Sequence, residues 1–599
     1  MEKVTLTIDG RSVTVPKDYT VLKAAKELNI NIPTLCYLPD INQIGACRMC
    51  LVEVKGARSL QASCTLPVAE GMEVKTNTPL LRQTRKTILE LILSDHNREC
   101  TTCVRSNNCE LQSMARQFGI KDIYFKTKLS PSKVDDLSPS IVRDQSKCIL
   151  CRRCIAVCHE VQGVGVIQAT MRGFHTTVEP AFGLSLNEVA CINCGQCIQA
   201  CPVGALKEKD DTEKVWQALA DPDKHVVVQT APAVRIALGE EFGLPPGSIV
   251  TGKMVSALRL LGFDRVFDTD FAADLTIMEE GTELINRIQK GGKLPLLTSC
   301  SPGWIKFLET YYPDMIDNLS TCKSPQQMMG AVIKTYYAQK AGVDPKQIYS
   351  VSIMPCTAKK YECERPEMNS SGYQDVDAVL TTRELAQMIR QAGIDFVSLE
   401  EGTFDSPLGE STGAAVIFGA TGGVMEAALR TVAEVLTGKE AENIEYHAVR
   451  GVEGIKEAGI QIGDLHLKAA VAHGTGNARK LLDRIRSGEA NYHFIEIMAC
   501  HGGCATGGGQ PIRTATEKMS TDFRKVRGQA LYKADGQLKF RKSHDNPEIK
   551  KIYEDFLGAP NSPKAHELLH THYSKRDLYP IIVNAIYIPL INVNKHRNK

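Results

Sequence analysis

The sequence lacks an excess of charge of either sign, since 71 lysines and arginines stand against 69 aspartates and glutamates among its 599 residues. A strongly basic domain is the usual footprint of nucleic-acid binding, so this balance gives no support to that function. The sequence also lacks an apolar run of 18 or more residues, which would indicate a membrane-spanning helix. Its glycine-rich segment GATGGVMEAALR has neither the GxGxxG nor the P-loop lysine pattern, and we expect no nicotinamide or flavin site in the chain.

We expect no signal peptide, because the opening segment MEKVTLTIDG alternates between polar and apolar residues as a strand does. Cysteine, by contrast, is plentiful: there are 21, and 15 of them precede residue 202. Without a secretory signal, so many cysteines favour metal binding over a disulfide framework. With 43% hydrophobic and 23% charged residues, the composition is that of a globular protein, and the length predicts about four domains. We therefore expect a cytoplasmic, multi-domain metalloprotein.

The pattern of apolar residues predicts an α+β organisation at the start of the chain and an α/β organisation later. Alternating residues 4–8 and 13–15 flank Asp9-Gly10, which is typical of a two-residue hairpin turn, and a helix capped by Thr20 follows. This order predicts a small β-grasp domain. We also expect a helix from about residue 84 and a polar connector over residues 128–146. From about residue 222, six apolar segments predict strands of a largely parallel sheet: HVVVQTA, KLPLLTSC, YSVSIMPC, AAVIFGA, AAVAHGT and FIEIMAC.

Two cysteine groups in the first 110 residues have the spacing of metal sites. The first follows the plant-type [2Fe–2S] arrangement in outline, with a four-cysteine zinc site as the alternative. It consists of Cys36, Cys47, Cys50 and Cys64. The second offers one imidazole and three thiolates, which suit zinc and iron–sulfur iron equally. It consists of His96, Cys100, Cys103 and Cys109.

Two further groups repeat the bacterial two-cluster ferredoxin run, in which the fourth cysteine of each motif ligates the other cluster. One [4Fe–4S] cluster is therefore expected on Cys148, Cys151, Cys154 and Cys201. The other is expected on Cys191, Cys194, Cys197 and Cys158. Such a row of clusters is typical of an electron relay that feeds a two-electron reaction elsewhere in the chain.

The later cysteines lie in three short motifs: LTSCSPGW around Cys300, MPCTAKKYE around Cys356, and EIMACHGGCATG around Cys500 and Cys504. On these motifs the chain resembles the [FeFe]-hydrogenases, whose catalytic domain carries TSCCPxW, MPCxxKxxE and ExMxCxxGCxxG. The resemblance extends over residues 1–570 and includes the accessory modules in the same order, as in the multi-cluster, NAD(P)-linked members. It implies one [2Fe–2S] cluster, three accessory [4Fe–4S] clusters and an H-cluster, which is a [4Fe–4S] cube joined to a di-iron unit with CO, CN⁻ and a bridging azadithiolate.

The resemblance also implies roles for individual residues. The cube would be held by Cys356, Cys500 and Cys504, the last of which would bridge to the di-iron unit. Lys359 would face a cyanide. The pocket around the di-iron unit would be lined by Met354, Met498, Pro232 and Gln326. Protons would pass along Cys300, Glu280, Ser320, Glu283 and Arg287. Glu279, in contrast, is expected on a solvated, charged helix face.

One motif departs from the family, because Cys300-Ser301 stands where the family has two adjacent cysteines. Aligned without gaps, Cys300 keeps the proton role and Ser301 replaces a cube thiolate, although a serine oxygen is a poorer match for cluster iron. Alternatively, Cys300 or Cys322 supplies the missing thiolate. The sequence leaves these three possibilities open.

On this basis the chain divides into a [2Fe–2S] β-grasp domain (1–78), a [4Fe–4S] domain with one histidine and three cysteines (79–127), a double [4Fe–4S] ferredoxin domain (138–210), an α/β catalytic domain (220–510), a small-subunit-like segment (511–572) and a tail without an assigned role (573–599). The expected reaction interconverts H2 with protons and electrons. Its expected partner, in a hetero-oligomer, is ferredoxin or a flavin-containing subunit that binds NAD(P)H. The rival hypotheses are a hydrogen or redox sensor built on the same domain and an electron-transfer subunit without catalysis.

Overall fold

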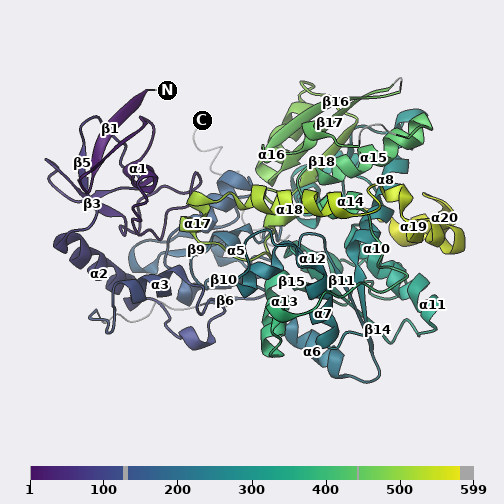
Figure 1. The fold of residues 1–599 in the computed structure, drawn as a ribbon, viewed down its shortest axis with the longest axis horizontal. Helices are drawn as coiled ribbons and strands as arrows, with labels where there is room; N and C mark the ends of the chain where they lie inside the picture. The colour runs from purple at the N-terminus through teal and green to yellow at the C-terminus, as the bar shows by residue number, and fades with distance from the viewer. Residues whose placement is uncertain (1, 126–132, 441–443, 464, 580–599) are drawn as a thin grey trace, which may run out of the picture.

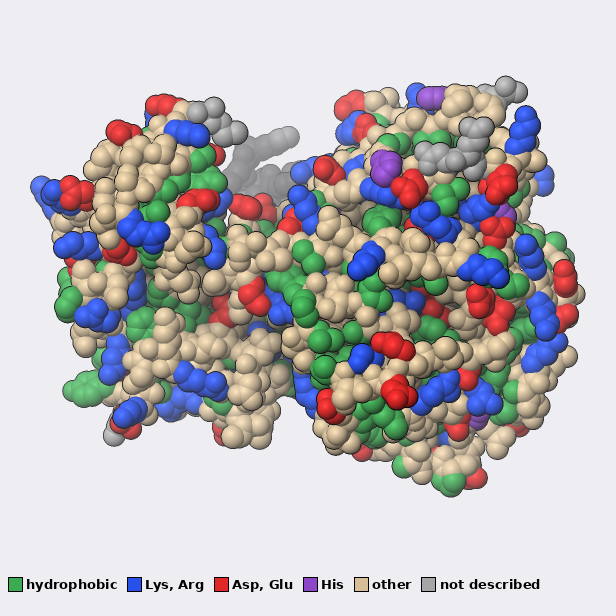
Figure 2. Space-filling view, viewed as in Figure 1, with side chains coloured by type: hydrophobic (Ala, Val, Ile, Leu, Met, Phe, Trp, Pro, Cys, Tyr) green, Lys and Arg blue, Asp and Glu red, His purple; other side chains and the backbone are tan. Residues whose placement is uncertain are grey.

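The computed structural model describes residues 2–125, 133–440, 444–463 and 465–579. The cysteine-rich N-terminal part lies at one end of the molecule, and the α/β part forms the larger, opposite end (Figure 1). Basic and acidic side chains are interspersed over the face drawn in Figure 2. Among the described residues, no helix combines the length and the apolar character that crossing a membrane would need. Most of the predicted tail, residues 580–599, lies outside the described residues.

The first part of the chain folds around a five-stranded sheet with the strand order β2-β1-β5-β3-β4. Its strands are β1 (Lys3–Ile8), β2 (Arg11–Pro16), β3 (Leu51–Val54), β4 (Gln61–Ala62) and β5 (Glu73–Lys75), and α1 (Val21–Glu27) shares their core. The predicted hairpin turn is confirmed, because Ile8 pairs with Arg11 and both Asp9 and Gly10 have positive φ, as a type I′ turn requires. Thr20 caps α1 as predicted, since its side chain accepts a hydrogen bond from the backbone N–H three residues later.

The middle part contains short helices and a small antiparallel sheet. Its helices are α2 (Pro79–Ser94), α3 (Glu110–Gln117), α4 (Arg153–Ala156) and α5 (Gln196–Ala200). The sheet has the order β10-β7-β6, from β6 (Val134–Asp135), β7 (Ile141–Asp144) and β10 (Leu206–Glu208). The helix predicted from about residue 84 is α2, which begins five residues earlier.

The prediction of a polar connector over residues 128–146 is wrong for residues 133–146. Strands β6 and β7 form there, and Asp135 and Arg143, each only 3% exposed, form an ion pair at 3.6 Å. Asp135 also accepts hydrogen bonds from the hydroxyl of Ser185 and the backbone N–H of Leu186, so this segment is held inside the fold. Residues 126–132, which include the start of this segment, lie outside the described part.

Two four-stranded sheets form the α/β part. The first is parallel throughout, in the order β12-β11-β14-β15, from β11 (His225–Thr230), β12 (Arg265–Asp268), β14 (Ile348–Met354) and β15 (Ala378–Thr381). The second has the order β13-β18-β17-β16, from β13 (Leu296–Leu297), β16 (Ile455–Ile462), β17 (Leu465–His473) and β18 (Phe494–Met498). Only the pair β16–β17 is antiparallel here.

Five of the six predicted strand segments are thus confirmed, and the sixth, AAVIFGA, is wrong. Its residues form α14 (Gly413–Val416) and a following 3-10 turn. All seven are buried, and a short helix that is enclosed by the core is apolar on every side, so its sequence looks like that of a buried strand. The segment GATGGVMEAALR makes a tight turn from this short helix into α15 (Gly423–Thr437).

Helices cover both sheets and close the molecule at its far end. They include α6 (Thr212–Ala220), α7 (Thr251–Leu260), α9 (Pro302–Tyr311), α10 (Pro325–Val332), α11 (Ala338–Ala341), α12 (Ala358–Cys363), α13 (Thr382–Gln391), α16 (Thr475–Arg486), α17 (Ala515–Ser520), α18 (Phe523–Gln537), α19 (Pro547–Ile552) and α20 (Pro563–Leu569). The longest is α8 (Thr269–Lys290), which packs against α10 and α15. Asp268 caps its start, and Gly291 ends it in the left-handed conformation, as helix caps commonly do.

Candidate functional site

A cavity of about 60 Å³ lies beyond the carboxyl ends of β11 and β14 and next to the end of β18. Parallel strands place their following loops at one edge of a sheet, which is where α/β folds form their sites. The lining includes eight of the residues that the sequence predicted for the catalytic centre. They are Pro232, Cys300, Gln326, Met354, Cys356, Lys359, Met498 and Cys504. Phe418, Ala231 and Thr269 also line it, and no motif had indicated them.

The cavity-lining thiols of Cys356 and Cys504 form a dense buried set with Cys500, which does not line the cavity itself. Burial raises the pKa of Cys500 well above its ordinary value, and the thiolates of Cys356, Cys194 and Cys504 raise it further. Burial likewise raises the pKa of Cys504 to about 12. Several thiolates this close together in an apolar environment are stable only around a cation that binds them, so the donor set fits a cluster of iron. The Sγ atom of Cys504 lies 4.0 Å from the Sδ atom of Met498.

Lys359 reaches the rim of the cavity from α12. Its Nζ donates hydrogen bonds to Glu362 Oε2 at 2.9 Å and to the carbonyl oxygen of Cys300 at 3.1 Å. Gln326 donates to the same Glu362 oxygen at 3.1 Å. Glu362 is 4% exposed and therefore fixes the ammonium group in place. Sequence reasoning assigned no role to Glu362, although it is the final residue of the MPCTAKKYE motif.

A chain of polar groups leads away from Cys300 along α8. Burial raises the pKa of Glu280 to about 8, the charge of Glu283 adds to the effect, and the hydroxyl of Ser320 opposes it. Ser320 also donates to Glu283 Oε2 at 2.9 Å, and Arg287 binds Glu283 Oε1 at 2.6 Å. The structure thus brings together all five residues of the predicted proton route. Their role in proton transfer stays a prediction.

The expectation for Glu279 is wrong, because this side chain is fully buried and not solvated. It accepts hydrogen bonds from the hydroxyl of Tyr553 at 2.5 Å and from the backbone N–H of Asn561 at 2.7 Å. Its Oε2 atom also lies 3.1 Å from His570 Nε2. The C-terminal helices α19 and α20 cover this face of α8, and helical periodicity alone gives no sign of that cover.

The three candidates for the fourth cube ligand lie in different surroundings. Ser301 Oγ accepts a hydrogen bond at 3.2 Å from the backbone N–H of Ala499, the residue before Cys500, and Ser301 does not line the cavity. Cys300 lines the cavity on the side of Glu280 and Lys359. Cys322 lies in another core cluster and does not line the cavity.

The eight cysteines of the ferredoxin-type repeat line two separate small cavities. One cavity is lined by Cys148, Cys151, Cys154 and Cys201. The other is lined by Cys158, Cys191, Cys194 and Cys197. In each set the fourth cysteine comes from the other motif, so the structure groups the residues as the spacing predicted. Burial raises the pKa of every one of these thiols for which a shift is resolved, and a bound cationic cluster relieves that penalty.

The four cysteines of the first N-terminal group also lie close together. The N–H of Cys36 donates to Cys47 Sγ at 3.4 Å, and Cys50 and Cys64 place their Sγ atoms 3.3 Å apart. In the second group, burial and the charge of Lys147 lower the pKa of His96 to about 4, which keeps the imidazole neutral. Its Nδ1 atom is buried without a partner, and a neutral imidazole nitrogen of this kind is a good metal ligand.

The ferredoxin-type segment packs directly onto the loop that follows β18. Cys500 Sγ lies 4.0 Å from the carbonyl oxygen of Cys194, and Thr357 donates to the carbonyl of Asn193 at 2.7 Å. A Cβ atom on Gly508 would lie 2.3 Å from the Cys194 oxygen, so only glycine fits there. Gly508 therefore admits the backbone of the neighbouring ferredoxin-type segment.

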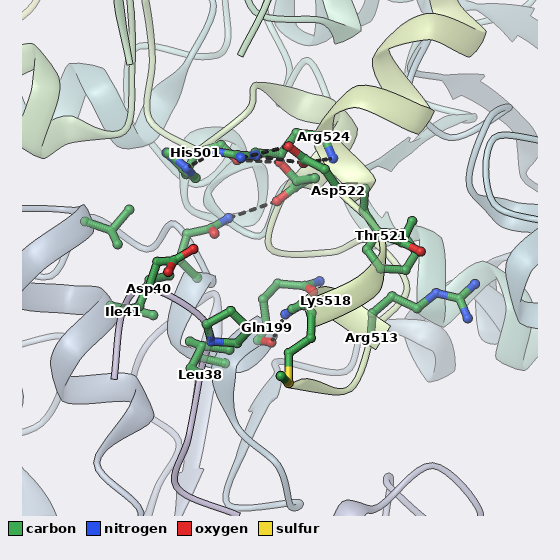
Figure 3. Close-up of a pocket in the computed structure, with 18 of the residues that line it drawn as sticks. Leu38, Asp40, Ile41, Gln199, His501, Arg513, Lys518, Thr521, Asp522 and Arg524 are labelled. Carbon is green, nitrogen blue, oxygen red and sulfur yellow. Dashed lines mark hydrogen bonds and ion pairs between the residues drawn. The ribbon is translucent and has the colours of Figure 1, made fainter. Parts of the chain in front are cut away.

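A second cavity, of about 470 Å³, lies where the N-terminal part, the ferredoxin-type segment and helices α17 and α18 meet (Figure 3). Arg524 points toward His501 there and donates to its Nε2 at 2.5 Å. Burial lowers the pKa of His501 to about 4, and the charge of Arg524 lowers it further. Lys518 Nζ donates to the carbonyl of Gln199 at 3.0 Å. No motif indicated this cavity, apart from the position of His501 next to Cys500.

Five regions of the chain match the models of known protein families. Residues 224–508 match the iron only hydrogenase large subunit, C-terminal domain, and residues 521–576 match the iron hydrogenase small subunit. Residues 1–79 match a 2Fe-2S iron-sulfur cluster binding domain, and residues 85–123 match the iron-sulfur binding region of NADH-ubiquinone oxidoreductase-G. Residues 147–205 match a 4Fe-4S dicluster domain.

Individual proteins extend this likeness over nearly the full length. The chain is 52% identical to the NADP-reducing hydrogenase subunit HndD of Solidesulfovibrio fructosivorans, over 96% of this chain and 100% of that protein. It is 43% identical to iron hydrogenase 1 of Clostridium pasteurianum, over 95% of this chain and 100% of that protein. Among solved structures, a variant of the [FeFe]-hydrogenase HydA1 from Chlamydomonas reinhardtii matches with a TM-score of 0.55 and 43% identity, over 61% of this chain and 99% of that one.

Proposed function

This chain belongs to the iron-only hydrogenases and carries iron–sulfur domains ahead of its catalytic domain, and from that premise we propose how its residues share the work of interconverting H2 with protons and electrons. The observation that carries the proposal is the single cavity that Cys300, Cys356, Lys359 and Cys504 line together. Thiols, an ammonium group and a titratable route out of the cavity are the groups that such a reaction needs from the protein.

The H-cluster is the cofactor that this cavity would hold. Cys356, Cys500 and Cys504 would bind its cube, and the bound cofactor supplies the iron at which H2 is made or split. Met354 and Met498 would pack beside the di-iron unit as polarisable side chains. Lys359 would offer its remaining N–H to a cyanide nitrogen, and Glu362 would hold it in position.

We infer that Ser301 occupies the fourth position around the cube. Its Oγ accepts a hydrogen bond from the backbone N–H of Ala499, the residue before Cys500, whereas Cys322 belongs to a different core cluster. Cys300 would then stay free to carry a proton. An oxygen ligand binds cluster iron less well than a thiolate does, so this cube would be held more weakly than one with four cysteines.

Protons would travel between Cys300 and the surface along α8. Cys300 would exchange its proton with Glu280, whose pKa of about 8 lets it take up and release protons near neutral pH. The Ser320 hydroxyl would pass the proton on to Glu283, which Arg287 orients at 2.6 Å. Glu283 and Arg287 form the partly exposed end of this proton route.

Electrons would use the opposite connection, through the cysteine groups of the N-terminal domains. The contact between Cys194 and Cys500 supports direct transfer between the nearest accessory cluster and the cube. The other two accessory [4Fe–4S] clusters and the [2Fe–2S] cluster would continue the relay outward. The name of the relative HndD, a subunit of an NADP-reducing hydrogenase, supports a flavin-containing, NAD(P)H-binding subunit as partner in a hetero-oligomer, and ferredoxin is the other candidate.

The decisive experiment combines infrared spectroscopy with gas measurement on protein matured under anaerobic conditions. We expect CO and CN⁻ bands, and H2 evolution from a reduced viologen dye. Bands without gas evolution would favour the sensor hypothesis. Iron and sulfide without either band would leave only an electron-transfer subunit. As a matched pair, Cys504→Ala should abolish the bands, whereas Cys363→Ala, at a buried cysteine outside the cavity, should retain them.

A further inference from the structure

Three metal-binding side chains of different chemistry meet outside the catalytic cavity. A carboxylate oxygen of Glu283, the Sγ atom of Cys322 and an imidazole nitrogen of His570 all lie within 4.8 Å of one another. Cys322 is 0% exposed and His570 is 8% exposed. A β-bridge between the backbones of Cys322 and His570 fixes two of the three donors relative to each other. The cluster is therefore built into the fold.

The surroundings of His570 are those of a metal-binding imidazole. Its Nε2 lies 3.1 Å from Glu279 Oε2, so the N–H belongs on this nitrogen and points at the carboxylate. Nδ1 then accepts a hydrogen bond at 2.8 Å from the hydroxyl of Thr321, which can rotate away and release the lone pair for a metal. A histidine that binds a metal usually donates its other N–H to a carboxylate in this way. Glu279, which the sequence placed in solvent, supplies that carboxylate.

The electrostatic environment also favours a cation. Burial raises the pKa of Cys322 well above its ordinary value, and the charges of Glu283, Glu280 and Glu279 raise it further. Arg287 is the cation that pairs directly with this group, through Glu283. A divalent ion would replace the thiol proton, which leaves to solvent, and would lower the repulsion between the thiolate and the carboxylates.

We propose that Glu283, Cys322 and His570 form a binding site for a zinc ion. Zinc takes nitrogen, sulfur and oxygen donors in a tetrahedron, with the donors about 3.5 Å apart, so small side-chain movements would close this cluster around it. Water would complete the shell. The exposed imidazole of His566 stacks on His570 with ring centroids 3.9 Å apart and offers a first contact for an arriving ion.

A zinc ion here would stop proton transfer, because Glu283 would bind the metal instead of exchanging protons with Ser320. This consequence rests on the proposed function, whereas the binding site itself rests on the geometry alone. Two measurements therefore distinguish failure of the zinc site from failure of the proposed function. The coordination shell of the metal tests the site, and H2 evolution without added zinc tests the proposed function.

The coordination shell can be measured on the cluster-loaded protein by zinc K-edge X-ray absorption after addition of one equivalent of zinc and removal of the excess. We expect one sulfur at about 2.3 Å and nitrogen or oxygen neighbours at about 2.0 Å. In Cys322→Ala and Cys322→Ser the sulfur neighbour should be lost. Cys363→Ala removes a cysteine that is also buried but lies outside the cluster, and it should leave the shell unchanged.

Turnover is compared with and without zinc within each variant, so that differences in basal rate cancel. In the unaltered protein and in Cys363→Ala, zinc should lower the rate of H2 evolution more than tenfold, and a chelator should restore it. Cys322→Ala should need at least ten times more zinc for the same loss. A shell of four sulfurs, a shell without sulfur, or equal zinc sensitivity of Cys322→Ala would each overturn the proposal.

Discussion

Glu280 is the point at which the proton route can be interrupted with the least change in shape. Glutamine keeps the size of the side chain and can still bond to Ser320, but it cannot take up or release a proton. Burial raises the pKa of Glu280 from its ordinary 4.5 to about 8, which corresponds to a cost of about 5 kcal/mol for ionising it inside the protein. Because Glu280 is only 2% exposed, bulk water has little access to this point of the route.

We therefore expect Glu280→Gln to lower kcat by at least about 100-fold, the usual contribution of a positioned acid or base, or about 3 kcal/mol in the barrier. The pH dependence has a definite sign. H2 evolution needs the protonated carboxyl and should fall as the pH rises through about 8, while H2 oxidation needs the carboxylate and should rise over the same range. In Glu280→Gln both changes should disappear. The rates are measured with a viologen dye in each direction between pH 6 and 10.

Glu279→Gln is the matched control, because Glu279 is the neighbouring residue, equally buried, and bonded to Tyr553 and His570 instead of Ser320. Its turnover should stay within a few fold of the unaltered protein. Infrared bands of the cofactor must be present in both variants, so that a loss of rate reflects the side chain. The reasoning fails if Glu280→Gln keeps half of the original rate, or if Glu279→Gln is equally slow.

Three further changes test other parts of the site. Ser301→Cys should keep four irons in the cube and make them harder to remove by a chelator, whereas Ser301→Ala should lose cube iron; equal iron retention in both would contradict ligation at this position. Lys359→Met leaves Glu362 without its ammonium partner and should reduce the CO and CN⁻ infrared bands more than the cube iron; full bands would show that Lys359 is dispensable for cofactor binding. Gly508→Ala forces a Cβ to within 2.3 Å of the Cys194 oxygen and should slow dye-linked turnover several-fold at unchanged cluster content, and an unaffected rate would show that this contact does not matter for electron transfer.

Spacing and short motifs predicted which residues meet wherever the geometry is local. The cysteine repeat predicted that Cys158 joins the set of Cys191, and the structure groups them around one cavity. The hairpin turn at Asp9 and Gly10 and the helix cap at Thr20 could also be predicted, because the conformations of these residues depend on the nearby backbone alone. The ligand roles of the cysteines stay predictions.

Other features depend on parts of the chain far apart in sequence, and there the sequence was insufficient. Glu279 and Glu280 are neighbours on α8, yet Glu279 is enclosed by residues that follow α19 and α20, such as Tyr553 and His570, far later in the chain. AAVIFGA has the composition of a buried strand and forms a helix, because burial on all sides removes the periodicity that distinguishes the two. The role of Glu362 could not be predicted although its motif was recognised, because only the hydrogen bond from Lys359 shows that Glu362 holds the ammonium group in place.

The contact of Cys194 with Cys500 has a consequence for how such a protein can change over time. Electrons would reach the cofactor through the loop after β18, whereas protons would reach it along α8. The residues that we assign to the electron route and those that we assign to the proton route are different. A new redox partner could then be accommodated by exchanging the modules up to residue 210 and adapting their contact with Gly508. The acid–base machinery of the catalytic domain would need no alteration.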